Sequence, residues 1–386
     1  MLTITYDSLS KISAQHGFSL SILPFSKLTL SDSVGKILNA WCLKGYGGEM
    51  NYLKRANSDP LQLFPGIKSI LVLGASYADR VQGICPSGYG RVARYAWGLD
   101  YHDVIPRRIQ VMLAEVQTFI GQPFKYRICC DSAPLMEKVL GERAGMGWRG
   151  AHSLLLAPGM GSFFFLAEVL CDLEVSGLPP MSHAKEDGCT ECHVCERVCP
   201  GKALKGRGCL DARRCISYLT VEKKGVFSWQ ERELIGEWVF GCDLCQEVCP
   251  YNQGDMGRDV FPEFRPDQGA GPFLELGRVL TLRSEVEFRA YLGKTALRRV
   301  GRERLLRNAA VVAGNMRAYG LLPCMLKTAR EDPSPLVRRH VLWALSKLAS
   351  GCDNSQRKNI KDALVEAHKE GRDGVAEEAG VLLELM

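Results

Sequence analysis

Two kinds of apolar pattern alternate in the first half of the chain. Residues 67–75, IKSILVLGA, and residues 124–130, FKYRICC, are short, rich in β-branched or aromatic side chains and bounded by Gly or Pro, which is typical of strands. Between them, residues 103–121 place apolar side chains at helical spacing and end at Gly121, a residue type that commonly terminates helices. Strands that alternate with helices predict a mixed α/β or α+β domain.

From residue 302 onward the apolar pattern is helical only, and it repeats. Residues 305–316, LLRNAAVVAGNM, align with residues 336–348, LVRRHVLWALSKL, at an offset of 31 residues. The Asp-Pro-Ser-Pro segment at 332–335 marks a turn between helix pairs. This pattern resembles a short HEAT-type solenoid, in which stacked helix pairs present an extended face.

Composition narrows the class of protein without identifying it. The chain has 386 residues, 46% of them apolar, which is enough for two or three domains with separate cores. Its longest weakly charged apolar stretch, 153–171, is interrupted by Pro158, Gly159 and Gly161 and so does not predict a membrane-spanning helix. The N-terminal residues lack the features of a secretory signal, so we expect a cytoplasmic protein with reduced thiols and no membrane partner.

Two cysteine runs stand out among the sixteen cysteines. Residues 189–200, CTECHVCERVCP, have the spacing C-x2-C-x2-C-x3-C-P, which is the pattern of bacterial ferredoxins. Residues 242–250 follow with C-x2-C-x3-C-P, one cysteine short of a second full set. In ferredoxins the fourth cysteine of a run binds the other cluster, so the two runs predict two [4Fe-4S] clusters rather than one.

The same logic assigns ligands to each cluster. The first cluster is expected to use Cys189, Cys192, Cys195 and Cys249. The second is expected to use Cys199, Cys242 and Cys245 with one further cysteine, for which Cys215 is the candidate and Cys209 the alternative. Zinc also binds four-cysteine sets, but the triple C-x2-C-x2-C run and the repeated Cys-Pro favour iron–sulfur clusters.

Asp131 lies where the strand at 124–130 ends and a helix is expected to begin near Pro134. Open α/β sheets place their chemistry at such strand ends, which makes Asp131 a candidate site residue. The alternative is that Asp131 or Ser132 only caps the following helix, as Asp and Ser often do. Position alone leaves both interpretations open.

Five segments in one order resemble epoxyqueuosine reductases, the family that completes the queuosine modification in the tRNA anticodon. They are ARYAWGLDYHDVI (93–105), CCDSAPLMEKVLGERAGMGWRG (129–150), GSFFFLAEVL (161–170), CISYLTVE (215–222) and GCDLCQEVCPYN (241–252). The resemblance runs from about residue 35 to the C-terminal repeats and surrounds the eight-cysteine pattern.

The resemblance implies an α+β fold in three consecutive parts. Residues 1–180 would form a nitroreductase-like cobalamin-binding domain, residues 181–260 a ferredoxin-like double-cluster module, and residues 261–386 a linker with HEAT-like repeats that bind tRNA. Asp131 falls on the family's proposed proton donor, a role that needs a raised carboxyl pKa near neutral pH. The residues implied around the cobalamin are Arg55, Tyr95, Asp131, Gly150, Ser153 and Tyr218.

Two segments depart from known patterns. The family reads G-W-x-G-K-N, whereas this chain has Ala151 and His152 in place of the lysine and asparagine; Arg149 is a candidate replacement for the lost charge. Asp100 and His102 resemble the start of the cobalamin signature D-x-H-x-x-G, but Ile105 stands where glycine is required. His102 is therefore interpreted as a structural or supporting residue.

Basic residues gather before the first helical repeat. The net charge of the whole chain is only +6, but six basic residues and one acid lie between 294 and 307. Arg298, Arg299 and Arg302 are expected to share a face that contacts the phosphates of tRNA, the alternative being an ordinary solvated helix face. We expect a monomer that receives electrons from an unidentified low-potential donor.

Two other classes fit part of the pattern. A corrinoid reductive dehalogenase would combine cobalamin with two clusters, but such proteins usually carry an export signal and have no need of a basic solenoid. An iron–sulfur electron-transfer protein would use the clusters to relay electrons to a partner bound by the repeats. The electron-transfer class predicts no bound cobalamin.

Overall fold

The computed structural model describes residues 2–28, 32–55, 60–79, 83–180, 189, 191–206, 208–254, 260–371 and 374–386. The chain divides into two compact units that interleave along the sequence. The first contains Met1–Arg80, Leu99–Arg213 and Asp243–Gln268; the second contains Val81–Gly98, Arg214–Cys242 and Gly269–Met386. The three consecutive segments expected from the sequence, with boundaries near 180 and 260, do not coincide with this division and remain a prediction.

A four-stranded sheet forms the centre of the first unit. Its strand order is β2 (Ser19–Pro24), β3 (Ser69–Ser76), β8 (Phe164–Cys171) and β5 (Tyr126–Cys129), and all neighbouring strands are antiparallel. The central strands β3 and β8 are buried along nearly their whole length, which explains their almost continuous apolar sequence. The mixed helix and sheet composition is therefore confirmed, in the α+β form with an antiparallel sheet.

Helix α4 (Tyr101–Ile120) begins and ends where its sequence signals place it. The Asp100 carboxylate accepts the backbone N–H of His102 at the N-terminus, and Gly121 adopts φ 77° at the C-terminus, a conformation that favours glycine. Helix α4 packs against α1 (Tyr6–Gln15). The strands predicted at 67–75 and 124–130 and the helix predicted at 103–121 correspond to β3, β5 and α4 and are confirmed.

Helix α5 (Glu137–Arg143) packs on β8, with Leu140 in the same apolar cluster as Ile70 and Val72 of β3. Two small strand pairs complete the sheets of this unit: parallel β1 (Thr3–Thr5) with β9 (Glu174–Ser176), and antiparallel β6 (Trp148–Arg149) with β7 (Leu155–Leu156). Its remaining α-helices are α2 (Asp32–Leu43), α3 (Pro60–Leu63), α6 (Val194–Val198) and α9 (Leu244–Glu247).

The second unit begins with a three-stranded sheet. Strand β4 (Tyr89–Val92) pairs in parallel with β10 (Trp238–Phe240) and antiparallel with β11 (Phe273–Glu275). Four short helices belong to the same unit: α7 (Ile216–Val221), α8 (Trp229–Ile235), α10 (Leu276–Leu280) and α11 (Glu285–Leu292).

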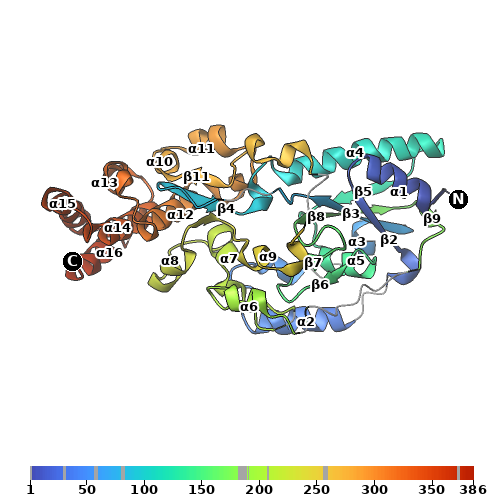
Figure 1. Ribbon diagram of the computed structural model, residues 1–386, viewed down its shortest axis with the longest axis horizontal. Coiled ribbons are helices and arrows are strands. Elements are labelled where there is room, and N and C mark those ends of the chain that lie inside the picture. The colour runs from blue at the N-terminus through green and yellow to red at the C-terminus, as the bar shows by residue number, and fades with distance from the viewer. Residues whose placement is uncertain are drawn as a thin grey trace. The chain divides into compact units, whose positions relative to one another are not determined.

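Five longer helices follow in the second unit (Figure 1). They are α12 (Gly301–Asn315), α13 (Leu322–Glu331), α14 (Pro335–Ala349), α15 (Asn354–Glu370) and α16 (Val375–Glu384). Helix α12 packs on α14, α13 packs on α14 and α15, and α14 packs on α16. The two aligned repeats at 305–316 and 336–348 thus occupy equivalent, directly packed helices. Within the described ranges, none of the helices is long and apolar enough to cross a membrane.

Candidate functional site

Four cysteines from two separate stretches of the sequence line one cavity in the first unit. Its walls include Cys189, Cys192, Cys195 and Cys249. Cys195 lies in α6, and Cys249 follows α9, which packs on α6. The structure therefore brings together the four ligands that the ferredoxin pattern assigns to the first cluster.

The chemistry of these thiols suits metal ligation. Burial raises the pKa of the Cys195 thiol to about 11 and also raises the pKa of Cys249. Both are thus neutral thiols without a metal, and cluster binding must release their protons. In the part of the chain that the structure describes, no three His, Cys, Asp or Glu side chains converge as they do around a single ion. A cubane does not require such convergence, because each thiolate binds a different iron.

The hairpin of β6 and β7 forms one wall of this cavity. Trp148 packs against Cys189 and Cys249, and the backbone N–H of Ala151 donates to Cys189 Sγ at 3.4 Å. The strands approach so closely that a Cβ at Gly147 would lie 1.9 Å from the carbonyl oxygen of Leu156, so only glycine fits there. The G-W-x-G segment of this chain thus lies beside Cys189 and Cys249.

The departure from that motif has a defined place in the structure. Ala151 and His152 both line the cavity, and burial, with a smaller effect of Lys138, lowers the pKa of His152 to about 4. Arg149, the candidate replacement for the family's lysine, pairs with Glu142 of α5 at 3.0 Å. Its charge therefore already has a partner within the same unit.

Asn252 fixes the segment that carries Cys249. Its side chain accepts the backbone N–H of Ser162 at 2.7 Å and donates to the Gln246 carbonyl at 2.8 Å. Asn252 is buried, and its backbone N–H also donates to the Cys249 carbonyl at 2.9 Å. These bonds connect the end of the second cysteine run to the loop that precedes β8.

The ligands predicted for the second cluster are divided between the two units. Cys199 and Cys245 belong to the first unit, where Cys199 Sγ accepts the N–H of Ala203 at 3.3 Å. Cys215 and Cys242 belong to the second unit. Cys215 is the N-cap of α7, and Cys242 follows β10 after Gly241.

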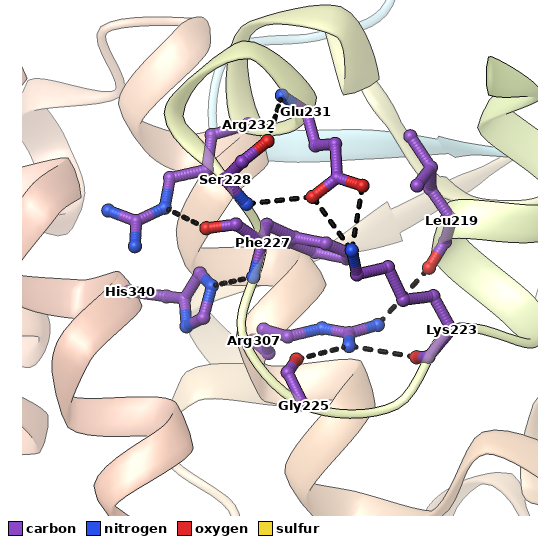
Figure 2. Close-up of polar contacts among 9 residues, drawn as sticks. All are labelled: Leu219, Lys223, Gly225, Phe227, Ser228, Glu231, Arg232, Arg307 and His340. Carbon is purple, nitrogen blue, oxygen red and sulfur yellow. Dashed lines mark hydrogen bonds and ion pairs between the residues drawn. The ribbon is translucent and has the colours of Figure 1, made fainter. Parts of the chain in front are cut away.

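Helix α12 holds the segment that follows Cys215. Figure 2 shows the buried Arg307 guanidinium donating to three carbonyl oxygens of this segment: Leu219 at 3.3 Å, Lys223 at 2.9 Å and Gly225 at 2.8 Å. In the same view His340 of α14 accepts the backbone N–H of Phe227 at 3.1 Å. Arg307 is one of the six basic residues between 294 and 307, but in the structure its buried guanidinium holds the segment after Cys215 through these hydrogen bonds.

Asn308, the next residue, connects both cysteine-bearing segments of the second unit. Its Nδ2 donates to the carbonyls of Thr220 at 2.7 Å and Val239 at 3.0 Å. The hydroxyl of Thr220 in turn accepts the N–H of Gly241, the residue before Cys242, at 2.9 Å. Asn308 was not predicted as a functional residue, because nothing in the local sequence pattern distinguishes a buried amide from an exposed one.

Asp131 lies after β5 with φ 52°, an uncommon conformation for a residue other than glycine. The Tyr101 hydroxyl donates to its Oδ2 at 2.7 Å, and the same oxygen lies 3.4 Å from His102 Nε2. The Asp131 backbone N–H donates to Glu137 Oε1 at 2.6 Å, which holds the loop in this conformation. The N-cap of α5 is Met136, without a side-chain cap, so the alternative that Asp131 or Ser132 caps this helix is wrong.

The expectation that Asp131 lies at the carboxyl end of a strand in an open α/β sheet is also wrong. Strand β5 is an edge strand of an antiparallel sheet, so the rule for the carboxyl ends of parallel strands does not apply. The loop from β5 to α5 places the carboxyl beside the N-terminus of α4 instead. There, Tyr101 and His102 supply the contacts.

His102 connects Asp131 to a second, buried carboxylate. Its Nδ1 lies 2.6 Å from Asp100 Oδ1, while its Nε2 faces Asp131. Asp100 is 1% exposed, so this pair orients the imidazole from the protein interior. The D-x-H sequence could have predicted that His102 contacts Asp100, although His102 was interpreted only as a structural or supporting residue.

Two further acidic residues near Asp131, Glu137 and Glu168, were not predicted from the sequence. Burial, and then the nearby Asp131 charge, raises the pKa of Glu137 to about 7. Glu168 of β8 is fully buried, and neither of its carboxyl oxygens has a hydrogen-bond partner among the described residues. Burial, and then the nearby Glu137 and Asp131 charges, raises the pKa of Glu168 well above its usual range. A lone glutamate within the apolar run FFFLAEVLC was the sequence signal.

The residues expected around cobalamin belong to both units. Asp131, Gly150 and Ser153 are in the first, Tyr95 and Tyr218 are in the second, and the side chain of Arg55 lies outside the described part of the chain. Ser153 has φ 70°, and its hydroxyl oxygen is shielded from solvent without a partner among the described residues. Such an oxygen fits contact with a polar atom of a bound ligand.

The basic patch differs from its prediction. Arg298 and Arg299 lie in a 3₁₀ helix, Ala296–Val300, where Arg298 is partly buried and Arg299 is exposed. Arg302 is 5% exposed and forms an ion pair with the buried Asp332. The prediction that all three arginines share a solvent-facing surface is therefore wrong for Arg302, because a carboxylate 30 residues away draws its guanidinium inside.

Two family models match the chain. The model described as "Epoxyqueuosine reductase QueG, DUF1730" matches residues 57–132, and the model described as "4Fe-4S double cluster binding domain" matches residues 188–252. Among curated proteins, the epoxyqueuosine reductase of Pseudomonas aeruginosa is 40% identical over 327 residues, covering 80% of this chain and 86% of that protein. The Escherichia coli K12 epoxyqueuosine reductase is 35% identical over 328 residues, covering 82% and 83%.

Solved structures show the same relationship. A crystal structure of epoxyqueuosine reductase with a tRNA-Tyr epoxyqueuosine-modified stem loop matches with a TM-score of 0.86 and 26% identity, covering 98% of both chains. A structure of the Bacillus subtilis epoxyqueuosine reductase, described with its aspartate catalytic loop swung out of the active site, matches with a TM-score of 0.83 and 27% identity, again over 98% of both chains. The resemblance found from the five sequence segments is confirmed: the chain is an oxidoreductase that belongs to the epoxyqueuosine reductase family.

Proposed function

We propose that this protein reduces the epoxide of epoxyqueuosine to the alkene of queuosine at the anticodon wobble position of tRNA, using cobalamin and two [4Fe-4S] clusters. The observation that carries the proposal is the Asp131 carboxyl, held by Tyr101 and His102 in the same unit as the thiols of the first cluster. The names of the relatives and the stem loop bound to one of them support the substrate.

The reaction needs two electrons and two protons, and it yields the alkene and water. A bound cobalamin would supply an electron-rich cobalt suited to opening the strained ring. Gly150, Ser153, Tyr95, Tyr218 and Arg55 are the residues proposed to hold it, within a fold related to nitroreductases. The solvent-shielded Ser153 hydroxyl supports this assignment, since it lacks a protein partner among the described residues.

Asp131 is proposed to donate the proton to the departing epoxide oxygen. Tyr101 and His102 both approach Oδ2, so they fix the carboxyl and stabilise the carboxylate that remains after proton transfer. His102, oriented by Asp100, is placed to return a proton to Asp131 for the next step. The aspartate catalytic loop named for the B. subtilis relative supports this role.

Two bound [4Fe-4S] clusters would supply the cobalamin with the electrons that the reduction needs. The first cluster would be held by Cys189, Cys192, Cys195 and Cys249, and the second by Cys199, Cys215, Cys242 and Cys245, with Cys209 as the alternative to Cys215. The common cavity of the first four thiols and the double-cluster family match support this assignment. The donor would be an unidentified low-potential protein or small molecule.

The helices after residue 300 are proposed to form HEAT-like repeats that dock the tRNA. Arg298 and Arg299, which precede α12, are the proposed phosphate contacts. Docking at a distance from the reacting base would let the modified nucleotide leave the anticodon stack. We propose that the protein acts as a monomer.

The first test is a metal analysis of anaerobically purified protein incubated with cobalamin. We expect about eight iron and one cobalt per chain, following two-cubane ligation. Eight iron without retained cobalt would favour the electron-transfer class instead.

Asp131→Asn should keep all metals and lose turnover on epoxyqueuosine-containing tRNA. Asp103 is an exposed aspartate in the first turn of α4, and Asp103→Asn should remain active. Retained turnover in Asp131→Asn would exclude the proton-donor role.

A further inference from the structure

His152 is a buried side chain at the wall of the cavity that the four cysteines line, and one of its ring nitrogens has no hydrogen-bond partner among the described residues. It is 4% exposed and lines the cavity together with the four thiols. Its Nδ1 accepts the backbone N–H of Leu154 at 3.2 Å. Because Nδ1 is the acceptor, the ring hydrogen must be on Nε2.

Nε2 has no hydrogen-bond partner among the described residues, although it is shielded from solvent. A buried N–H without a partner costs about 1–3 kcal/mol, so it indicates a partner that the described residues do not provide. Gly150 makes room for the ring, because a Cβ there would lie 3.0 Å from His152 Cε1 and 3.3 Å from Nε2. The loop is thus built around this imidazole.

The backbone next to His152 already donates a hydrogen bond to a sulfur atom. The N–H of Ala151 donates to Cys189 Sγ at 3.4 Å, so the 151–152 segment approaches the cluster with donors. His152 cannot be a fifth iron ligand in this form, since the cavity already contains four cysteines and Nε2 carries its hydrogen. Four cysteines line this cavity, so a sulfur atom of the cluster or of its ligands is the acceptor that the Nε2 donor would meet there.

We propose that His152 donates a hydrogen bond from Nε2 to a sulfur of the first cluster and thereby raises its reduction potential. This inference rests on the proposed first-cluster ligand set. The physical reason is charge: reduction adds an electron to the cluster, and a hydrogen bond to a more negative acceptor is stronger. This chain would then use an imidazole at the position where the family motif G-W-x-G-K-N has an asparagine.

The test compares His152→Leu, which removes the donor at similar volume, with His152→Asn, which restores the family's amide. In an EPR-monitored redox titration of the two-cluster protein, we expect one of two reduction steps to shift to lower potential in His152→Leu. At a fixed ambient potential the reduced-to-oxidised ratio of that cluster should fall about tenfold, equivalent to about 59 mV for a one-electron couple. His152→Asn should recover part of the shift.

Direct evidence would come from pulsed EPR of the reduced protein labelled with ¹⁵N-histidine. A weak nitrogen coupling to one cluster should be present in the wild type and absent in His152→Leu. Iron content near eight and two reduction steps in both variants show that the clusters are intact, which separates this inference from the ligand assignment. Unchanged potentials with no nitrogen coupling overturn the proposal, as does a change confined to cobalamin affinity.

Discussion

The side-chain amide of Asn308 donates to the carbonyl oxygen of Thr220 across 2.7 Å, joining the first long C-terminal helix to the helix that follows Cys215. Its second bond, to Val239, holds the strand that precedes Cys242. One buried amide therefore sets the spacing between two cysteine-bearing segments that are more than twenty residues apart in the sequence. The C-terminal helices thus have a structural role in addition to the proposed docking of tRNA.

Replacing Asn308 by Leu should selectively weaken the second cluster. Two carbonyls would lose their donor inside the protein, at a cost of about 1–3 kcal/mol each, and the Cys215 and Cys242 segments would separate. Iron analysis should fall from about eight to about four per chain. Asn315→Leu is the matched control: Asn315 also donates to two carbonyls, those of Arg232 and Gly236, but neither segment carries a cysteine ligand. Full iron content in Asn308→Leu would contradict the prediction.

Tyr101→Phe should slow the chemical step without weakening tRNA binding. The variant removes the 2.7 Å bond to Asp131 Oδ2, and a hydrogen bond to a charged group contributes about 1.5–3 kcal/mol. We therefore expect the single-turnover rate to fall by roughly tenfold to hundredfold while the Kd for the tRNA stays constant. Tyr126→Phe, on strand β5, should leave both quantities unchanged. A larger Kd with an unchanged rate would assign Tyr101 to binding instead.

Glu137 predicts a pH-dependent stability. Its folded pKa of about 7 lies above the ordinary value of 4.5, so the folded state binds the proton more tightly than the unfolded state. The corresponding stabilisation is fully present below about pH 4.5 and is lost as the pH rises through 7, by roughly 1–3 kcal/mol. Glu137→Gln should therefore show a smaller decrease in thermal midpoint between pH 5 and pH 7.5 than the wild type. Equal decreases in the two proteins would rule out the raised pKa; Glu142→Gln serves as the control.

Arg298 and Arg299 should contribute to tRNA binding through charge. Replacing both by Ala is expected to weaken the Kd and to reduce the salt dependence of binding by roughly two phosphate contacts. Arg289→Ala is the control, because that exposed arginine already pairs with Glu285 one turn away on α11. An unchanged salt dependence in the double variant would show that the tRNA docks on another surface.

Arg302→Ala should act differently and destabilise the fold by about 3–5 kcal/mol, since it leaves Asp332 buried without its partner.

Local patterns were sufficient for the main elements and for the iron–sulfur chemistry. The apolar runs at 67–75 and 124–130 and the helix ending at Gly121 depend on neighbours within one element, and the structure reproduces them. The cysteine spacing likewise encodes its own chemistry, because C-x2-C places thiols within reach of one cluster. The five segments of the family were enough to identify the reductase, which the comparisons confirm.

Only the tertiary structure decided where the charged side chains lie. Arg302 and Arg307 look like surface charges beside Arg298 and Arg299, yet Asp332 and the carbonyls after Cys215 bury them. The shifted pKa values of Glu168 and His152 have a similar origin, because residues distant in sequence remove water from both side chains. Sequence by itself thus determined the elements, the iron–sulfur character of the cysteine runs and the family, since these depend on short-range spacing. The antiparallel strand order, the contacts of Asp131 and the burial of individual charges required the folded chain, because desolvation and pairing depend on neighbours that only folding brings together.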